Sequence, residues 1–156
     1  FAQSFKADGT VRDTTIYTYD GDVLDYTTTY NQGTEDSKDI SGLSKKSMTN
    51  YVGNAKGEEI ADYQFTYKGA AGSETVSSTN VYFYLAAHKR ASDSGVTADD
   101  AMTASASYRG DKSTAAYTDK TDLRSRTHYT GEKGEELADF AQSFKADGTV
   151  RDTTIY

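Results

Sequence analysis

The chain has 156 residues, a formal net charge of −7 at pH 7 and a hydrophobic content of 35%. The acidic balance argues against a nucleic-acid partner, because such partners select a basic surface. Cysteine is absent, which excludes disulfides and thiolate metal sites, and no apolar run reaches the ~20 residues of a membrane span. Proline is absent as well, so every backbone N–H can join a sheet.

Alternation of side-chain character along the chain predicts β-strands. In chain order the expected strands cover residues 10–20, 22–31, 43–52, 58–68, 74–86, 101–109, 112–130 (broken), 135–146 and 149–156. Residues 32–42 and 86–100 are expected loops, and a helical turn is the alternative within the second. Asp8-Gly9 and Asp147-Gly148 predict type I′ hairpin turns. Short strands at this regular spacing predict an all-β, antiparallel fold.

One stretch of seventeen residues occurs twice, as Phe1–Tyr17 and again as Phe140–Tyr156. The offset gives a period of 139 residues and indicates a window onto a longer tandem-repeat chain. In this interpretation residues 1–10 end a preceding repeat, and 11–76 and 76–150 are two half-repeats. Residues 140–156 then start the next repeat. The expected architecture is an extended twisted sheet or a solenoid-like filament.

The half-repeats are indicated by a second, weaker match. Gly57–Tyr63 corresponds to Gly134–Phe140, and the tyrosine spacing of the first half recurs in the second. If equivalent strands stack, the hypothesis pairs the following aromatics: Tyr17 with Tyr82, Tyr30 with Tyr108, Tyr51 with Tyr129, and Tyr63 with Phe140.

The segment Tyr17-Thr18-Tyr19-Asp20-Gly21, followed by Val23-Leu24, resembles the tyrosine–aspartate (YD) repeats of RHS-type proteins. The likeness covers Thr15–Tyr30, with an echo at Asn80–Tyr84. It departs from the family pattern because Gly-Arg-Leu does not follow the dipeptide and Leu85 follows Tyr84. The resemblance implies extended, exported β-repeats and no particular activity.

Few side chains suggest chemistry. Asp20, Asp22 and Asp25 could bind calcium, although a solvated hairpin turn is the favoured alternative; Asp93, Asp99 and Asp100 are a weaker case. A basic stripe for an anionic polysaccharide is weighed against simple charge balance, which is favoured; its residues are Lys45, Lys46, His88, Lys89, Arg90, Arg124 and Arg126. No Ser/His/Asp grouping is suggested by spacing, so we expect no enzyme activity and no cofactor.

The leading hypothesis is a structural segment of an extracellular or cell-surface filament, whose partners are adjacent repeats and possible further chains of the fibre. Exposed hydroxyls at Thr27–Thr29 and Ser73–Thr79 could carry O-linked sugars. The alternative is an adhesin-type module that binds glycans through exposed tyrosines. Hydroxyl accessibility at Tyr19, Tyr84 and Tyr117 separates the two hypotheses.

Overall fold

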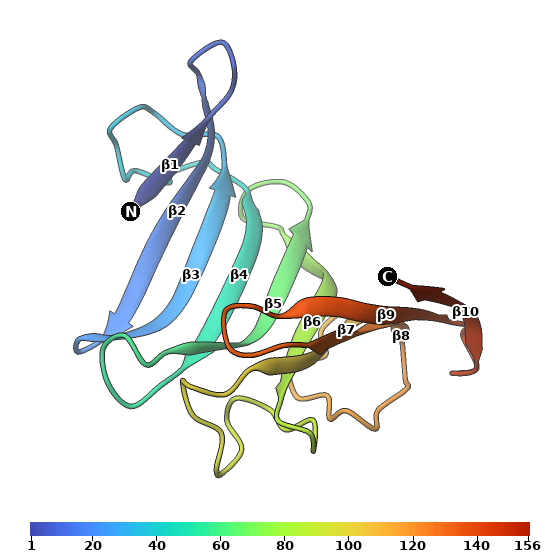
Figure 1. Ribbon diagram of the computed structural model, residues 1–156. Coiled ribbons are helices and arrows are strands. Elements are labelled where there is room, and N and C mark those ends of the chain that lie inside the picture. The colour runs from blue at the N-terminus through green and yellow to red at the C-terminus, as the bar shows by residue number, and fades with distance from the viewer.

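A computed structural model describes all 156 residues as ten strands and no helix (Figure 1). The strands are β1 (Ala2–Phe5), β2 (Val11–Asp20), β3 (Val23–Asn31), β4 (Lys45–Val52), β5 (Ile60–Lys68), β6 (Thr75–Tyr84), β7 (Met102–Arg109), β8 (Leu123–Thr130), β9 (Leu137–Phe144) and β10 (Val150–Ile155). They form one antiparallel sheet in the order β1 to β10. The predicted all-β, antiparallel class is confirmed. Nothing in the chain folds into a long apolar helix of the kind that crosses a bilayer.

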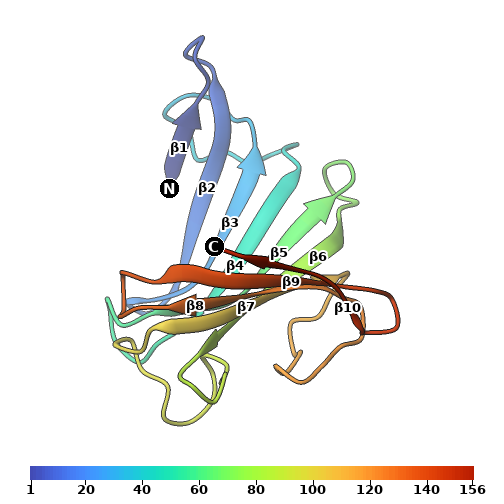
Figure 2. The ribbon, with the colours of Figure 1, turned by 45° about the vertical axis from the view of Figure 1, so that its right-hand side comes forward.

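Strand order and chain order coincide, so each strand contacts only its neighbours in sequence. The sheet is strongly twisted: β7–β10 run nearly crosswise to β2–β5 (Figures 1 and 2). A single sheet with this much twist is concave on one side, and strands that are far apart in the sheet face that side without a second layer. The structure therefore shows one open sheet, while the extension into a tandem array stays a prediction.

A β-bulge interrupts each of the nine strand pairings, always where a Phe or Tyr near the end of one strand meets the next. The aromatics are Phe5, Tyr19, Tyr30, Tyr51, Tyr67, Tyr84, Tyr108, Tyr129 and Phe144. The extra residues on the following strands are Arg12, Asp25, Lys46, Asp62, Ser77, Thr103, Arg124, Asp139 and Arg151. Because a bulge increases local twist, nine of them account for the curl of the sheet.

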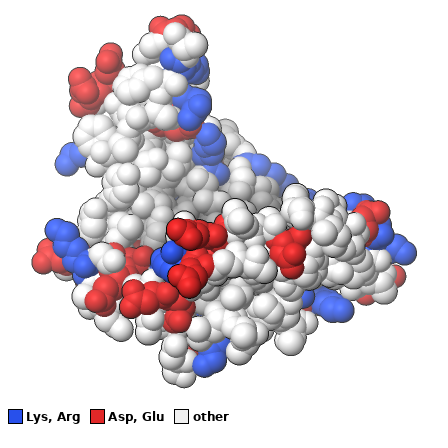
Figure 3. Space-filling view, viewed as in Figure 1, with Lys and Arg blue, Asp and Glu red and all other residues white.

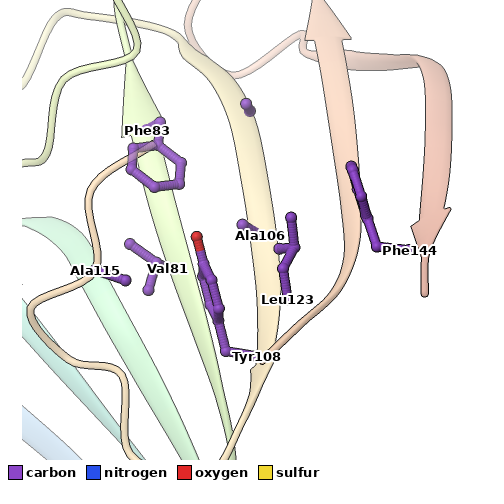
Figure 4. Packing of buried hydrophobic residues seen from close by; sticks show 8 residues of the cluster. Val81, Phe83, Ala106, Tyr108, Ala115, Leu123 and Phe144 are labelled. Atoms are coloured by element: carbon purple, nitrogen blue, oxygen red, sulfur yellow. The ribbon is translucent and has the colours of Figure 1, made fainter. Parts of the chain in front are cut away.

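The core is small and lies under two long loops, with 22 of 156 residues buried. The larger cluster joins β6, β7, β8 and β9 to the β7–β8 loop through Val81, Phe83, Ala104, Ala106, Tyr108, Ala115, Leu123 and Phe144. Figure 4 shows Tyr108 between Val81 on one side and Leu123 on the other. The β6–β7 loop covers a second cluster of Ile60, Tyr84 and Ala91. The long loops thus act as the covering layer that a single sheet lacks.

Three expectations about local structure are wrong. Residues 110–122 form a loop and not the first half of a strand, because Ala115 and Tyr117 are needed to cover the core. Ala2–Phe5 form a strand that the alternation pattern does not predict. The Asp8-Gly9 turn is not type I′, since only Gly9 has a positive φ, of 83°, and a type I′ turn requires two such residues.

The same strand layout occurs twice, in β2–β5 and in β6–β9. Thr14 and Thr79 are both fully buried. Thr14 donates a hydrogen bond to the carbonyl of Gln32, and Thr79 donates one to the carbonyl of Gly110. The two acceptor residues have left-handed backbones, with φ of 67° and 64°. The halves differ chiefly after Asp20 and Tyr84, where two residues in the first half are replaced by the β6–β7 loop in the second.

Candidate assembly edges

The two identical segments fold into the same hairpin at opposite edges of the sheet. Phe5 pairs with Val11 across a bulge at Arg12, and Phe144 pairs with Val150 across a bulge at Arg151. In both turns an Asp side chain accepts bonds from a Thr two residues later: Asp8 from Thr10, and Asp147 from Thr149. The sequence therefore encodes this hairpin locally, whatever lies beside it.

The two copies of the hairpin bury opposite strands: the first copy buries its second strand, and the second copy buries its first strand. Val11 of the first copy is 7% exposed, whereas its twin Val150 is 44% exposed. Phe144 of the second copy is 8% exposed, whereas its twin Phe5 is 46% exposed. Each hairpin is thus covered on the side that faces the interior of the sheet and open on the side that faces its edge.

The first copy shows what covers the second strand of the hairpin. The Lys46 Nζ lies 2.8 Å from the Asp13 carboxylate, which also accepts from Arg12 and Ser4. Burial favours the neutral acid, but these bonds outweigh it and hold the pKa of Asp13 below its ordinary value. Gln3 bridges Thr14 to backbone carbonyls of the β3–β4 loop.

The second copy shows what covers the first strand of the hairpin. Phe144 packs with Leu123 in the core, and the guanidinium of Arg126 lies 5.8 Å from the centre of its ring. Phe140 stacks on His128, with ring centres 4.2 Å apart. In the first copy the corresponding Phe1 and Phe5 are exposed.

The predicted stacking pairs do not form. Three strands separate the members of each pair in the one sheet, so they lie about 19 Å apart along it. None of the four pairs is among the ring contacts of the structure. The repeat left two arrangements open, stacked strands or one continued twisted sheet. In this chain the equivalent strands follow one another in one sheet, and the pairs mark equivalent positions in successive four-strand units.

Each of the eight aromatics has other surroundings. Tyr108 is fully buried, with its hydroxyl 3.2 Å from the Asp119 carbonyl. Tyr63 packs beside Phe65 at 5.0 Å, and the Tyr129 hydroxyl lies 3.1 Å from Ser105 Oγ. Tyr30, Tyr51 and Tyr82 are half-buried, and Tyr17, on β2, is 39% exposed.

The three tyrosines that separate the fibre and adhesin hypotheses differ in accessibility: one is exposed, one half-buried and one buried. Tyr19 is 55% exposed. Tyr84 is buried and donates a 2.6 Å bond to the Ala61 carbonyl, and burial raises the pKa of its phenol. Tyr117 is sandwiched between His88, at 4.0 Å, and Arg126, at 3.9 Å. Two of the three rings are therefore engaged in contacts within the chain.

The acidic candidates do not assemble into a metal site. Asp20 and Asp22 lie exposed at the β2–β3 turn, and Asp25 is the bulge residue of β3. No group of three or more acidic or histidine side chains in the structure could hold a metal ion.

Sequence reasoning missed a set of glutamate clamps. Glu59 accepts the backbone N–H groups of Leu24 and Gly57, and Glu136 accepts those of Met102 and Gly134. Glu74 does the same with Lys45 and Gly72. Each glutamate side chain accepts one N–H from the turn that precedes it. It also accepts the backbone N–H of the residue just before a bulge, two strands away in the sheet. The Gly-Glu-Glu match between Gly57–Tyr63 and Gly134–Phe140 is the signal in the sequence for two of these three clamps.

Comparisons with known proteins add little. No family model and no curated protein matches the chain. A solved protein of unknown function from Bacteroides fragilis NCTC 9343 aligns over 96% of this chain and 94% of its own, with 14% identity and a TM-score of 0.28. A likeness at that level carries no argument about fold or function.

Proposed function

We propose that this chain is a structural segment of a tandem-repeat β-array that builds a filament or surface fibre. The observation that carries the proposal is the complementary burial of the two identical hairpins. The open strand β1 has the same sequence as the covered part of β9. The open strand β10 has the same sequence as the covered part of β2. One period placed after another would give every internal hairpin both sets of contacts.

Physical chemistry favours such an extension. The unpaired N–H and C=O groups along β1 and β10 form open edges that invite further strands. Burying one Val or Phe side chain contributes about 1.5–3 kcal/mol, and each junction would cover Phe1, Phe5, Val150 and Ile155. Stability in repeat arrays grows through such nearest-neighbour terms. The location that we propose, outside the cell, rests on the resemblance to YD-repeat chains.

The test compares chains of one, two and three 139-residue periods. We expect the thermal midpoint to rise with each added period and the unfolding transition to stay cooperative across the junction. Small-angle scattering should show one particle that lengthens in equal steps. If every chain melted at the same temperature, with separate beads in scattering, the periods would be independent domains and the array would be rejected.

A further inference from the structure

The two ends of the strands carry different charges. The turns after β2, β4, β6 and β8, with adjoining strand ends, hold thirteen Asp and Glu against four Lys and Arg (residues 18–26, 50–63, 84–103 and 128–140). The opposite end holds eleven against twelve (residues 1–13, 30–46, 67–77, 108–125 and 144–156). In Figure 3, Asp and Glu gather at the lower left, while Lys and Arg follow one another from the top toward the right. This second end, which we name the basic end, has one more cation than it has carboxylates, in a chain whose net charge is −7.

The bulges contribute to this division. Their acidic residues, Asp25, Asp62 and Asp139, all lie at the acidic end, and their basic residues, Arg12, Lys46, Arg124 and Arg151, all lie at the basic end. The charge of a bulge side chain therefore depends on which end of the strands the bulge occupies.

A cavity of about 280 Å³ lies at the basic end, between the β7–β8 loop and the β9–β10 hairpin. Four cations line it, together with Asp122 and an apolar floor that includes Leu123 and Phe144; the cations are Arg109, Arg124, Lys145 and Arg151. Three strands and a turn thus bring positive groups to one concave surface.

Most of this charge has no partner in the protein. Arg151 pairs with Asp152, and Asp122 is 3.4 Å from Lys112. Arg109, Arg124 and Lys145 make no ion pair. Arg126 does not line the cavity; it is buried without a carboxylate, its guanidinium lies over the Tyr117 ring, and its Nε has no hydrogen-bond partner. Uncompensated cations that gather around a cavity favour an anion in it.

The equivalent place in the first half is built differently. Asn31 stands where Arg109 does, and Ser77 stands where Arg151 does, while the strand pairings are the same. Glu74 adds a negative charge there and accepts the Lys45 N–H. The fold therefore does not require an arginine at either position.

We propose that this cavity binds a carboxylate-bearing sugar ring, such as a uronic acid unit. Arginine suits a carboxylate because its planar fork donates two parallel bonds. The volume is just below the roughly 300–1,000 Å³ of small-molecule pockets, which suits one ring and exceeds the needs of a bare anion. The apolar floor offers a surface to the C–H groups of the ring. The site goes beyond the proposed fibre role, since every lining residue belongs to this chain.

The test is calorimetric titration of the whole chain at low salt with D-glucuronate, D-glucose, glutarate and sulfate. We expect saturable glucuronate binding that weakens with salt, no measurable glucose binding, and at least tenfold weaker binding of glutarate and sulfate. Equal binding of glucose would remove the role of the cations. Equal binding of glutarate or sulfate would reject the sugar and leave a general anion surface, such as one for acidic protein segments.

A matched pair of variants locates the site. Arg109→Asn with Arg151→Ser installs the first-half residues, and we expect at least a tenfold loss of glucuronate affinity with unchanged far-UV circular dichroism. Arg12→Ser makes the same chemical change in the first hairpin, outside the cavity, and should bind as the original chain does. Unchanged affinity in the double variant would overturn the site. If that variant failed to fold, amide shift mapping on the original chain would decide, since perturbations away from Arg109, Lys145 and Arg151 would contradict the assignment.

Discussion

At the scale of single residues, a buried ion pair ties both long loops to the sheet. Asp62, the bulge residue of β5, receives two bonds from Arg90, of 2.9 and 2.6 Å, and a third from the Ala91 N–H. Arg90 also donates to the Ala115 carbonyl in the β7–β8 loop. The two side chains are 7% and 11% exposed, so neither charge can turn to water if the other is lost.

We expect Asp62→Asn to destabilise the chain by about 3–5 kcal/mol, because it leaves the Arg90 charge buried without its partner. Urea unfolding measures this directly. The double variant Asp62→Leu with Arg90→Met should regain much of the loss, since a buried pair replaced by apolar groups is often tolerated. A cost below 1 kcal/mol for the single variant would show that the pair is solvated in solution.

The glutamate clamps make a prediction about acid. The hydrogen bond from the Leu24 backbone N–H is the largest cause of the lowered pKa of Glu59. For Glu136 the largest cause of the lowered pKa is the bond from its own backbone N–H, and the bond from the Met102 N–H contributes as well. A lowered pKa in the folded state means that the unfolded chain binds more protons. This contribution to stability is therefore present above the ordinary carboxyl pKa and lost as the pH falls through the folded value.

We expect the variant Glu59→Gln with Glu136→Gln to lose less of its thermal midpoint than the original chain between about pH 5 and 3. The neighbouring pair Glu58→Gln with Glu135→Gln is the control, because neither side chain accepts a hydrogen bond. Equal acid sensitivity in the clamp variant and the original chain would contradict the assignment.

At the scale of elements, the strands could be predicted from alternation and turn residues, as Val11–Asp20 and Ile60–Lys68 illustrate. The loop at 110–122 could not, because Thr114, Tyr117 and Thr121 have strand propensity and only packing on the core overrides it. The bulges also escaped prediction. A bulge moves every later residue to the other face, and its only mark in the sequence is an aromatic before a turn.

Part of the candidate site could also be predicted from the sequence, and part could not. The identical segments pointed to the edges, and their conformations could be expected to agree because the sequence is the same. The partners of the eight aromatics could not be inferred, since equivalence in a repeat does not say whether units stack or lie side by side. The basic cavity depends on Arg109 and Arg151, which are 42 positions apart in the sequence and meet only through the order of the strands.

At the scale of the whole molecule, the twin hairpins provide a comparison within one chain. Phe144→Ala should cost about 3–5 kcal/mol, as expected for a buried ring, whereas Phe5→Ala should stay within about 1 kcal/mol because its ring is largely in water. Val11→Ala and Val150→Ala should follow the opposite order, with Val11 the costlier. Chemical denaturation of the four variants measures these differences. Similar costs for Phe5 and Phe144 would mean that the edges are already covered in solution.

The succession of strands also determines how the chain would respond to tension. Because β1 and β10 lie at opposite edges, a pull on the two ends acts across the strands, and the pairings would open one after another, as in a zipper. Each freed strand of ten residues would add up to about 33–36 Å of length. Every hairpin can close again with only its neighbour in sequence, which is a rapid process. A fibre of such units would stretch at modest force, dissipate the load in small steps and recover.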